Sequence, residues 1–213
     1  GGTGNDIIDG GEGNDIINFA TTGDLTNKDT VDGGAGADTL NVTSAVTTTT
    51  VPTLTSVETV VLTAASGIVT ADLALATDLT SLSIAVGSTD VAFSVSNIAS
   101  GATVKNLETG AITATLDTTA AGSLTFDVAA NGNSTAAFTI TDAATVTVTS
   151  TGTGTNDISS LALDAVDTTS LTVTGATTAS ATLATGNITA TDQVTSVALT
   201  SSTSGATVTL GTI

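Results

Sequence analysis

The feature that most constrains this chain is a nine-residue repeat at its beginning. Residues 1–9 read GGTGNDIID, residues 10–18 read GGEGNDIIN and residues 33–41 read GGAGADTLN. These three units place glycine at positions one, two and four, aspartate at position six and a bulky aliphatic residue at position eight. Residues 24–32, DLTNKDTVD, have lost the glycines but keep the aspartate and the aliphatic residue in frame. We therefore count four units, with a five-residue insertion, 19–23, between the second and the third.

Each unit has the composition of a cation-binding turn followed by a short strand. Glycine allows positive φ, so a Gly-Gly-x-Gly run can turn tightly with its carbonyl oxygens aimed inward. Calcium takes about six to eight oxygen ligands and accepts both carboxylates and backbone carbonyls. The three residues after the turn, such as Ile7–Asp9, are expected to form a strand whose middle side chain points inward. Ordinary glycine-rich hairpin turns are the alternative, and the in-register copies favour the repeat.

The four units resemble the calcium-binding nonapeptide repeats of RTX proteins. This resemblance implies a parallel β-roll in which two repeats form one coil and calcium lies between turns that are two repeats apart. It therefore implies that Asp6 faces Asp29 and that Asp15 faces Asp38. The turn residues that it implies as calcium-binding are Gly2, Gly4, Asp6, Gly11, Gly13, Asp15, Asp29, Gly34, Gly36 and Asp38.

The charge of the chain indicates the same kind of partner. Twenty acidic residues stand against Lys28 and Lys105, which gives a net charge of −18, and eight of the acids lie in the first 41 residues. Such a balance argues against binding to nucleic acid and to anionic membrane surfaces. No apolar run reaches the roughly eighteen residues of a membrane-spanning helix, so no membrane insertion is expected. Divalent cations are the expected partner.

A different rhythm follows residue 41. Short segments in which apolar residues alternate with Thr or Ser recur with centres roughly 20 to 25 residues apart, a spacing found in solenoids. The segments are residues 38–42, 58–63, 80–86, 102–107, 122–128, 144–150, 169–175 and 195–202. We predict an all-β chain with an RTX β-roll over residues 1–41 and a Thr/Ala/Val-rich parallel β-solenoid over residues 42–213. Side chains expected to face inward are Leu82, Ile84, Leu124, Phe126, Val146, Val148, Leu171 and Val173.

An antiparallel β-sandwich after the repeats is the alternative fold. It needs additional strands between those segments, and Val91–Val95, Ala111–Leu116 and Ala136–Thr141 are candidates. Helical signals are weak: the best candidate, Ile68–Leu82, has unevenly spaced apolar residues and several threonines, which disfavour a helix.

The side chains needed for most enzyme chemistry are missing. The chain has no His, Cys or Tyr, which leaves little for general acid–base, nucleophilic or zinc catalysis. Asp157, Asp164 and Asp167 are the nearest approach to an acidic cluster of the kind used in glycoside hydrolysis, and turn caps or solvated loop residues are the simpler interpretation. We expect a protein that is not an enzyme.

A second resemblance covers Asp38–Ala65. A repeat that ends in DTLN, followed by Val57-Glu58-Thr59 and then Leu62, is similar to RTX-containing bacterial surface-layer proteins. It implies type I secretion, calcium-dependent folding outside the cell and self-association into a two-dimensional coat. A cell-surface polysaccharide, bound through a region not in this chain, is a further implied partner. The chain starts within a repeat and is expected to be a fragment; an RTX adhesin stalk or the calcium-folding tail of a secreted enzyme are the alternatives.

Overall fold

The structure is a computed structural model of the chain. It describes residues 1–21, 23–43, 52–64, 68–86, 91–107, 111–129, 134–151, 155–164, 170–176, 182–190, 196–200 and 207–210.

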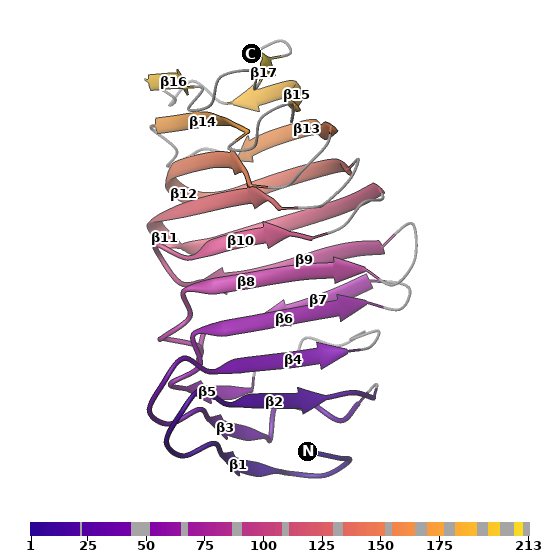
Figure 1. Ribbon diagram of the computed structural model, residues 1–213, viewed down its shortest axis with the longest axis vertical. Helices are drawn as coiled ribbons and strands as arrows, with labels where there is room; N and C mark the ends of the chain where they lie inside the picture. Colours follow the sequence, from indigo (N-terminus) through magenta and orange to yellow (C-terminus); the bar gives the residue numbers. More distant parts are fainter. Residues whose placement is uncertain are drawn as a thin grey trace.

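The chain winds as a single stack of parallel β-strands, with the N-terminus at one end and the C-terminus at the other (Figure 1). The strands of the first half are β1 (Ile7–Asp9), β2 (Ile16–Phe19), β3 (Thr30–Asp32), β4 (Thr39–Thr43), β5 (Thr53–Thr55), β6 (Thr59–Ala64), β7 (Ile68–Asp72), β8 (Ser81–Val86), β9 (Val91–Ile98) and β10 (Thr103–Asn106). Those of the second half are β11 (Ala111–Val128), β12 (Ser134–Ser150), β13 (Thr155–Asp164), β14 (Ser170–Ala176), β15 (Thr182–Ala190), β16 (Ser196–Thr200) and β17 (Thr207–Leu210).

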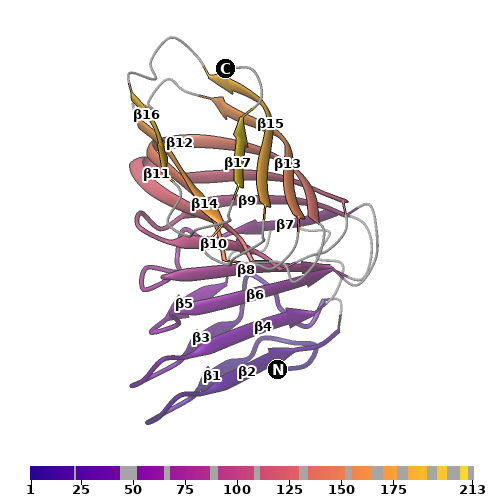
Figure 2. The ribbon, with the colours of Figure 1, turned by 45° about the horizontal axis from the view of Figure 1, so that its top comes forward.

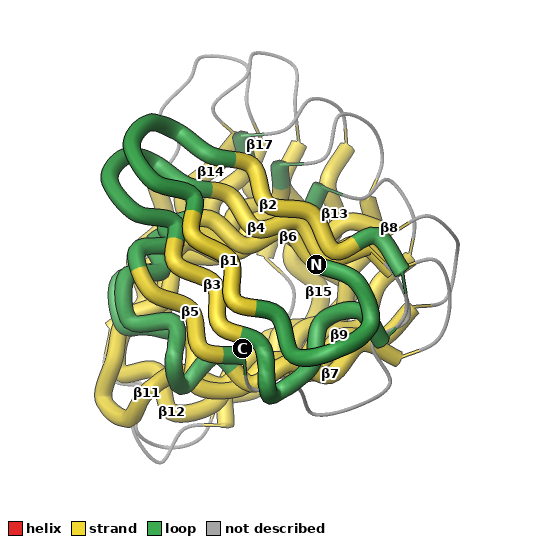
Figure 3. The backbone as a smooth tube through the Cα atoms, turned by 90° about the horizontal axis from the view of Figure 1, so that it is seen from below, coloured by secondary structure: helices red, strands yellow, loops and turns green. Residues whose placement is uncertain are grey.

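One circuit of the chain, which we call a coil, supplies a strand to each of two walls. In the first coil these strands are β1 and β2; β1 pairs with β3 of the next coil, and β2 pairs with β4. The view along the stack shows the successive strands lying over one another around a common interior (Figure 3). Partners such as Ser81 and Thr103 are a full coil apart in sequence. Every strand pairing in the described residues is parallel, as a solenoid requires.

The core consists of columns in which the same register position is apolar in coil after coil. Thr and Ser occupy the neighbouring, outward positions, which explains the alternation seen in the sequence. One buried column contains Ile17, Leu40, Val60, Leu82, Val104, Phe126 and Val148, each joined to the next by strand register. The four phenylalanines, Phe19, Phe93, Phe126 and Phe138, are the largest side chains buried in this interior.

Higher in the stack the two walls become continuous. β11 and β12 each run from one wall to the other without a break, and their register shifts between Asp117 and Gly122 and between Gly122 and Ser123. Figure 2 shows these long curved strands above the flatter strands of the first coils. β2, β4 and β6 to β17 belong to one 14-stranded sheet, whereas β1, β3 and β5 form a separate three-stranded sheet.

The structure confirms the prediction of an all-β chain of parallel coils. The inward positions predicted from the sequence are buried, except for Val173, whose side chain lies outside the described part. The antiparallel alternative is wrong: its three candidate strands exist in β9, β11 and β12, but they pair in parallel as the second wall of the same stack. The weak helix candidate Ile68–Leu82 instead contains β7 and the start of β8.

Candidate calcium site

Two glycine-rich turns lie directly over one another at one corner of the first coils. The lower turn, residues 10–15, connects β1 to β2, and the upper turn, residues 33–38, connects β3 to β4. The two backbones are joined where the Ala35 N–H donates to Gly11 O at 2.8 Å and the Gly13 N–H donates to Ala35 O at 2.7 Å. The sequence repeat therefore becomes a repeat in space, with like positions of successive coils in register.

The aspartates that end these turns are stacked in the same way. The Asp15 N–H donates to Asp38 Oδ1 at 2.8 Å, and the Thr39 N–H donates to Asp15 O at 2.9 Å. Asp38 is fully buried. The pairing of Asp15 with Asp38, implied by the resemblance to RTX repeats, is present in the structure.

The other corner of these coils pairs Asp6 with Asp29 in the same geometry. The Asp6 N–H donates to Asp29 Oδ1 at 2.7 Å, and Asp29 is 1% exposed. Here, however, the Oδ2 atom of each aspartate has a donor in the chain. Asp29 Oδ2 accepts from the Thr26 N–H at 2.5 Å, and Asp6 Oδ2 accepts from the Gly2 N–H at 3.0 Å. The loss of the glycines in residues 24–32 has produced a turn that hydrogen-bonds its own aspartate.

The stack of lower and upper turns leaves two carboxylate oxygens without a donor. Asp15 Oδ2 and Asp38 Oδ2 are both buried and make no hydrogen bond to the residues that the structure describes. An ionised oxygen in such a position costs far more than it gains unless a cation or donor meets it. A calcium ion, which takes carboxylate and carbonyl oxygens, supplies that partner.

Asp127 shows how the same chain satisfies a buried carboxylate without a cation. Asp127 is 4% exposed, and its two oxygens accept from the Thr151 N–H at 2.9 Å and from Thr151 Oγ1 at 2.7 Å. Asp15 and Asp38 have no such neighbour for Oδ2. The comparison indicates that the buried carboxylates of Asp15 and Asp38, unlike that of Asp127, need a cation.

Glycine at the first position of each turn keeps space beside these oxygens. A Cβ on Gly10 would collide with Gly33 O and lie 2.9 Å from Asp15 Oδ2. A Cβ on Gly33 would collide with Ser56 O and lie 2.5 Å from Asp38 Oδ2. In both coils, therefore, the unpaired carboxylate oxygen of one turn lies near a backbone carbonyl of the coil above, which is the oxygen set that calcium prefers.

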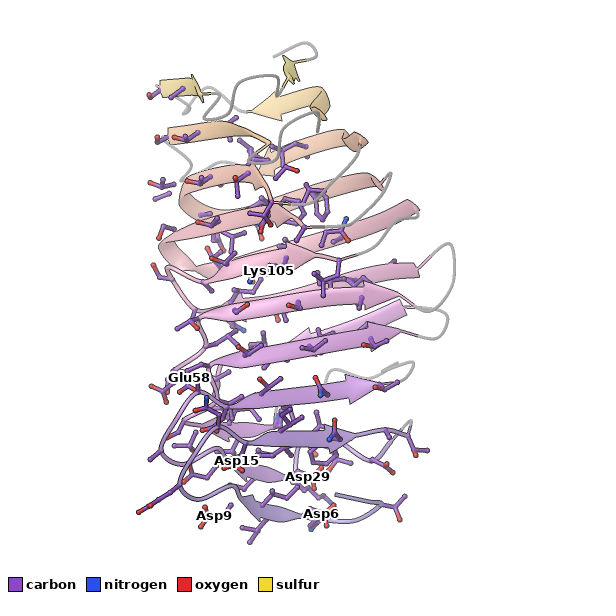
Figure 4. All side chains as sticks on the ribbon, viewed as in Figure 1. Asp6, Asp9, Asp15, Asp29, Glu58 and Lys105 are labelled. Atoms are coloured by element: carbon purple, nitrogen blue, oxygen red, sulfur yellow. The ribbon has the colours of Figure 1, made fainter. Side chains whose placement is uncertain are left out.

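The remaining predicted site residues take two kinds of position. Gly11, Gly13, Gly34 and Gly36 lie in the stacked turns with positive φ, as Gly-rich turns require. Gly2 and Gly4 belong to the first unit, beside Asp6. Figure 4 shows Asp15 and Glu58 toward one edge of the stack, with Asp6 and Asp29 away from it.

Sequence reasoning did not include Glu58 among the site residues. The Asp38 N–H donates to Glu58 Oε2 at 2.7 Å, so Glu58 takes in the third coil the place that Asp38 takes in the second. The signal was present in the sequence. Glu58-Thr59-Val60 repeats the pattern acid-Thr-aliphatic of Asp38-Thr39-Leu40, but the turn before Glu58 has no glycine and escapes the nonapeptide pattern.

Comparison with protein families supports the assignment of the repeats. Residues 1–22 and 26–42 match the RTX calcium-binding nonapeptide repeat, in four copies. RTX nonapeptide repeats bind calcium, and proteins that carry them are typically secreted from the cell. Comparison with curated proteins and with solved structures found no match.

The family match indicates a calcium site, yet the described residues contain no cluster of metal-ligating side chains. No group of three or more His, Cys, Asp or Glu side chains converges on one point in the described residues. The repeat does not need one, because backbone carbonyls can supply most of the oxygens and each turn adds one carboxylate. The described part of the chain also holds no helix with the length and apolar character that a membrane crossing requires.

Proposed function

We propose that this chain is part of a bacterial surface-layer subunit, in which calcium orders the N-terminal coils outside the cell and supports assembly into a two-dimensional lattice. The observation that carries the calcium function is the pair of buried, donor-less oxygens on Asp15 and Asp38 in stacked glycine-rich turns. The protein is proposed to be non-catalytic and to lie at the cell surface. Its coils are proposed to have a structural role in the lattice.

The surface-layer role has its own support at the junction after the repeats. The segments that resemble surface-layer proteins, DTLN and VETxxL, lie side by side as β4 and β6, with Leu40 opposite Val60 and Val42 opposite Leu62. Both strands bury these aliphatic side chains in one continuous core. The motif is thus the connection by which repeat coils continue into coils of another composition.

The charge of the chain is the reason for proposing that calcium takes part in self-association. Copies that each carry −18 repel one another unless a cation screens or bridges them. Calcium can do both, because it is divalent and accepts ligands from two chains. Attachment to a cell-surface polysaccharide would require a region outside this chain.

The test is assembly of the full-length protein. In millimolar calcium it should form two-dimensional sheets, visible by electron microscopy and by sedimentation, and chelator should return it to monomers. Sodium chloride at equal ionic strength is the control for simple screening. If sheets never form, or if sodium chloride restores them as well as calcium does, the lattice role is wrong and an adhesin stalk or the tail of a secreted enzyme takes its place.

A further inference from the structure

We infer that residues 56–58, which we call the cap turn, complete a second calcium site together with the upper turn, and that Glu58 is a ligand of that ion. This inference rests on the calcium function proposed above and extends it beyond the nonapeptide units. The cap turn lies outside residues 26–42, where the match to the RTX repeat ends.

The first step compares two similar spaces, one between the lower and upper turns and one between the upper turn and the cap turn. Between the lower and upper turns, Asp15 Oδ2 lies beside Gly10 and the carbonyl of Gly33 faces the same point. Between the upper turn and the cap turn, Asp38 Oδ2 lies beside Gly33 and the carbonyl of Ser56 faces the same point. The second space repeats the first, one coil higher, with Ser56 in place of glycine.

The second step is the unmet demand of Asp38. Its side chain is 0% exposed, and Oδ2 has no hydrogen-bond donor. This oxygen lies on the side of the cap turn, as its closeness to Gly33 and Ser56 O shows. The ion between the lower and upper turns would be met by Asp15 Oδ2, so Asp38 Oδ2 requires a cation of its own.

The third step is the replacement of an aspartate by a glutamate. Asp38 Oδ1 accepts the Asp15 N–H at 2.8 Å, and Glu58 Oε2 accepts the Asp38 N–H at 2.7 Å. Three residues separate Thr55 from Thr59, whereas six separate Asp32 from Thr39, so the cap turn is much shorter than the upper turn. Glu58 nevertheless keeps the register position of Asp38, because each acid directly precedes the first residue of its strand, Thr59 and Thr39.

The cap turn is also held in a ligand-presenting conformation. Ser56 has a φ of 50°, in the left-handed region that non-glycine residues seldom adopt. Its N–H donates to Asp78 Oδ2 at 3.1 Å, a contact from the fourth coil that fixes the peptide. With that N–H turned up the stack, Ser56 O faces down toward Gly33 and Asp38.

Above the cap turn the acidic column ends. The register position occupied by Asp15, Asp38 and Glu58 is taken by Thr80 in the next coil and then by the buried residues Ala102 and Leu124. In this register column, carboxylates are therefore present only from the lower turn to the cap turn. Asp78 lies in the turn above, outside the column, where it accepts the Ser56 N–H.

The experiment compares calcium binding by the full chain carrying Glu58→Gln with that of the wild type, using calorimetry and equilibrium dialysis. Glutamine keeps an oxygen that can accept the Asp38 N–H but removes the charge. We expect one bound ion to be lost or its affinity to fall about ten- to a hundredfold. Glu12→Gln is the matched control, because Glu12 lies exposed in the lower turn and should leave the number of ions unchanged.

A measurement on the wild type makes the answer independent of how the variant folds. The chain contains three glutamates, Glu12, Glu58 and Glu108, so a carbon-13 label on glutamate carboxylates gives a simple infrared band. Calcium should shift the antisymmetric stretch of one of them to a coordinated value. An unshifted band, or a Glu58→Gln variant that binds as many ions as tightly as the wild type, would overturn the cap-turn site alone. A wild type that binds no calcium would overturn the calcium function as well.

Discussion

The two carboxylate oxygens of Asp38 have different roles. One oxygen closes the ladder of stacked aspartates by accepting the Asp15 N–H, and the other is buried without a donor. Folding without a cation must therefore leave this charge buried without a partner or keep it near water. Asp9, the last residue of the first unit, is by contrast exposed at the end of β1.

We predict that Asp38→Asn weakens calcium binding by the full chain about tenfold or more, as expected for the loss of a ligand charge. Asn keeps the acceptor for the Asp15 N–H, so the stack of turns should survive. Asp9→Asn removes the same charge from an exposed site and should change the affinity little. Calorimetric titration checks both variants; equal losses in the two would show that only net charge matters.

Glycine at the upper turn gives a second prediction at this scale. Gly34 has a φ of 93°, and a Cβ there would collide with the backbone of Gly11, whereas Gly23 has a φ of 87° with open space around it. Positive φ alone should cost each alanine variant about 1–2 kcal/mol. Gly34→Ala should lose clearly more stability than Gly23→Ala in calcium, because only Gly34→Ala must separate two coils. Denaturant unfolding measures the difference, and equal losses would mean that the turns are not in close contact.

The strands show how far period-two alternation predicts structure. The segments 80–86, 102–107 and 169–175 were predicted as strands and become β8, β10 and β14. The inward faces follow as well, because alternation in a strand determines which side chains share a face. Sequence reasoning separated 111–116 from 122–128, but β11 runs through both. The residues between the two segments, 117–121 (DTTAA), do not by themselves predict a strand that bends around the corner with a register shift.

The candidate site was predictable to the extent that it follows the nonapeptide spacing. Asp15 and Asp38 were identified because glycine and aspartate recur at fixed intervals. Sequence reasoning missed Glu58 because its turn is short and contains no glycine. Only the strand register shows that Glu58 lies in the same column as Asp15 and Asp38. The lost glycines of residues 24–32 distinguish the turn of Asp29 from that of Asp38, but they do not show that both Asp29 oxygens have donors whereas Asp38 Oδ2 has none.

Phe126 tests the packing of the second half of the stack. It is fully buried, and its ring centroid lies 3.9 Å from that of Phe138, which comes from the opposite wall. Phe126→Ala should lower the free energy of unfolding by about 3–5 kcal/mol, because a solenoid interior cannot close readily over the cavity. Thr125→Ala, one position away on the outer face, should cost much less. Thermal unfolding of the two variants would decide, and a small loss for Phe126→Ala would contradict a tightly packed interior.

At the scale of the whole molecule, calcium should act unequally along the stack. The first coils concentrate acidic residues and expose Ile7 and Ile16 (87% and 68% exposed), whereas the coils from β8 to β12 contain fully buried apolar columns. Coils in a solenoid contact only their neighbours, so one end can unfold while the rest remains.

Removal of calcium from the full chain should raise amide hydrogen exchange in β1 to β6 while β8 to β12 keep their protection. Mass spectrometry of peptides after exchange, with calcium and with chelator, measures this. Magnesium in place of calcium is the control, because it requires a smaller and stricter octahedral site. Uniform loss of protection along the chain, or none at all, would contradict a local role for the ion.

The parallel register also determines how this protein responds to tension. Its inter-strand hydrogen bonds run along the stack, so a pull on the two ends loads them one coil after another rather than all together. A released coil of the length between Ser81 and Thr103 adds about 70 Å of chain. Stretched in a single-molecule instrument, the chain should lengthen in regular steps of this size. Calcium bound at the glycine-rich corner should raise the force needed to unfold the first coils, because these coils could not separate until the ion had dissociated.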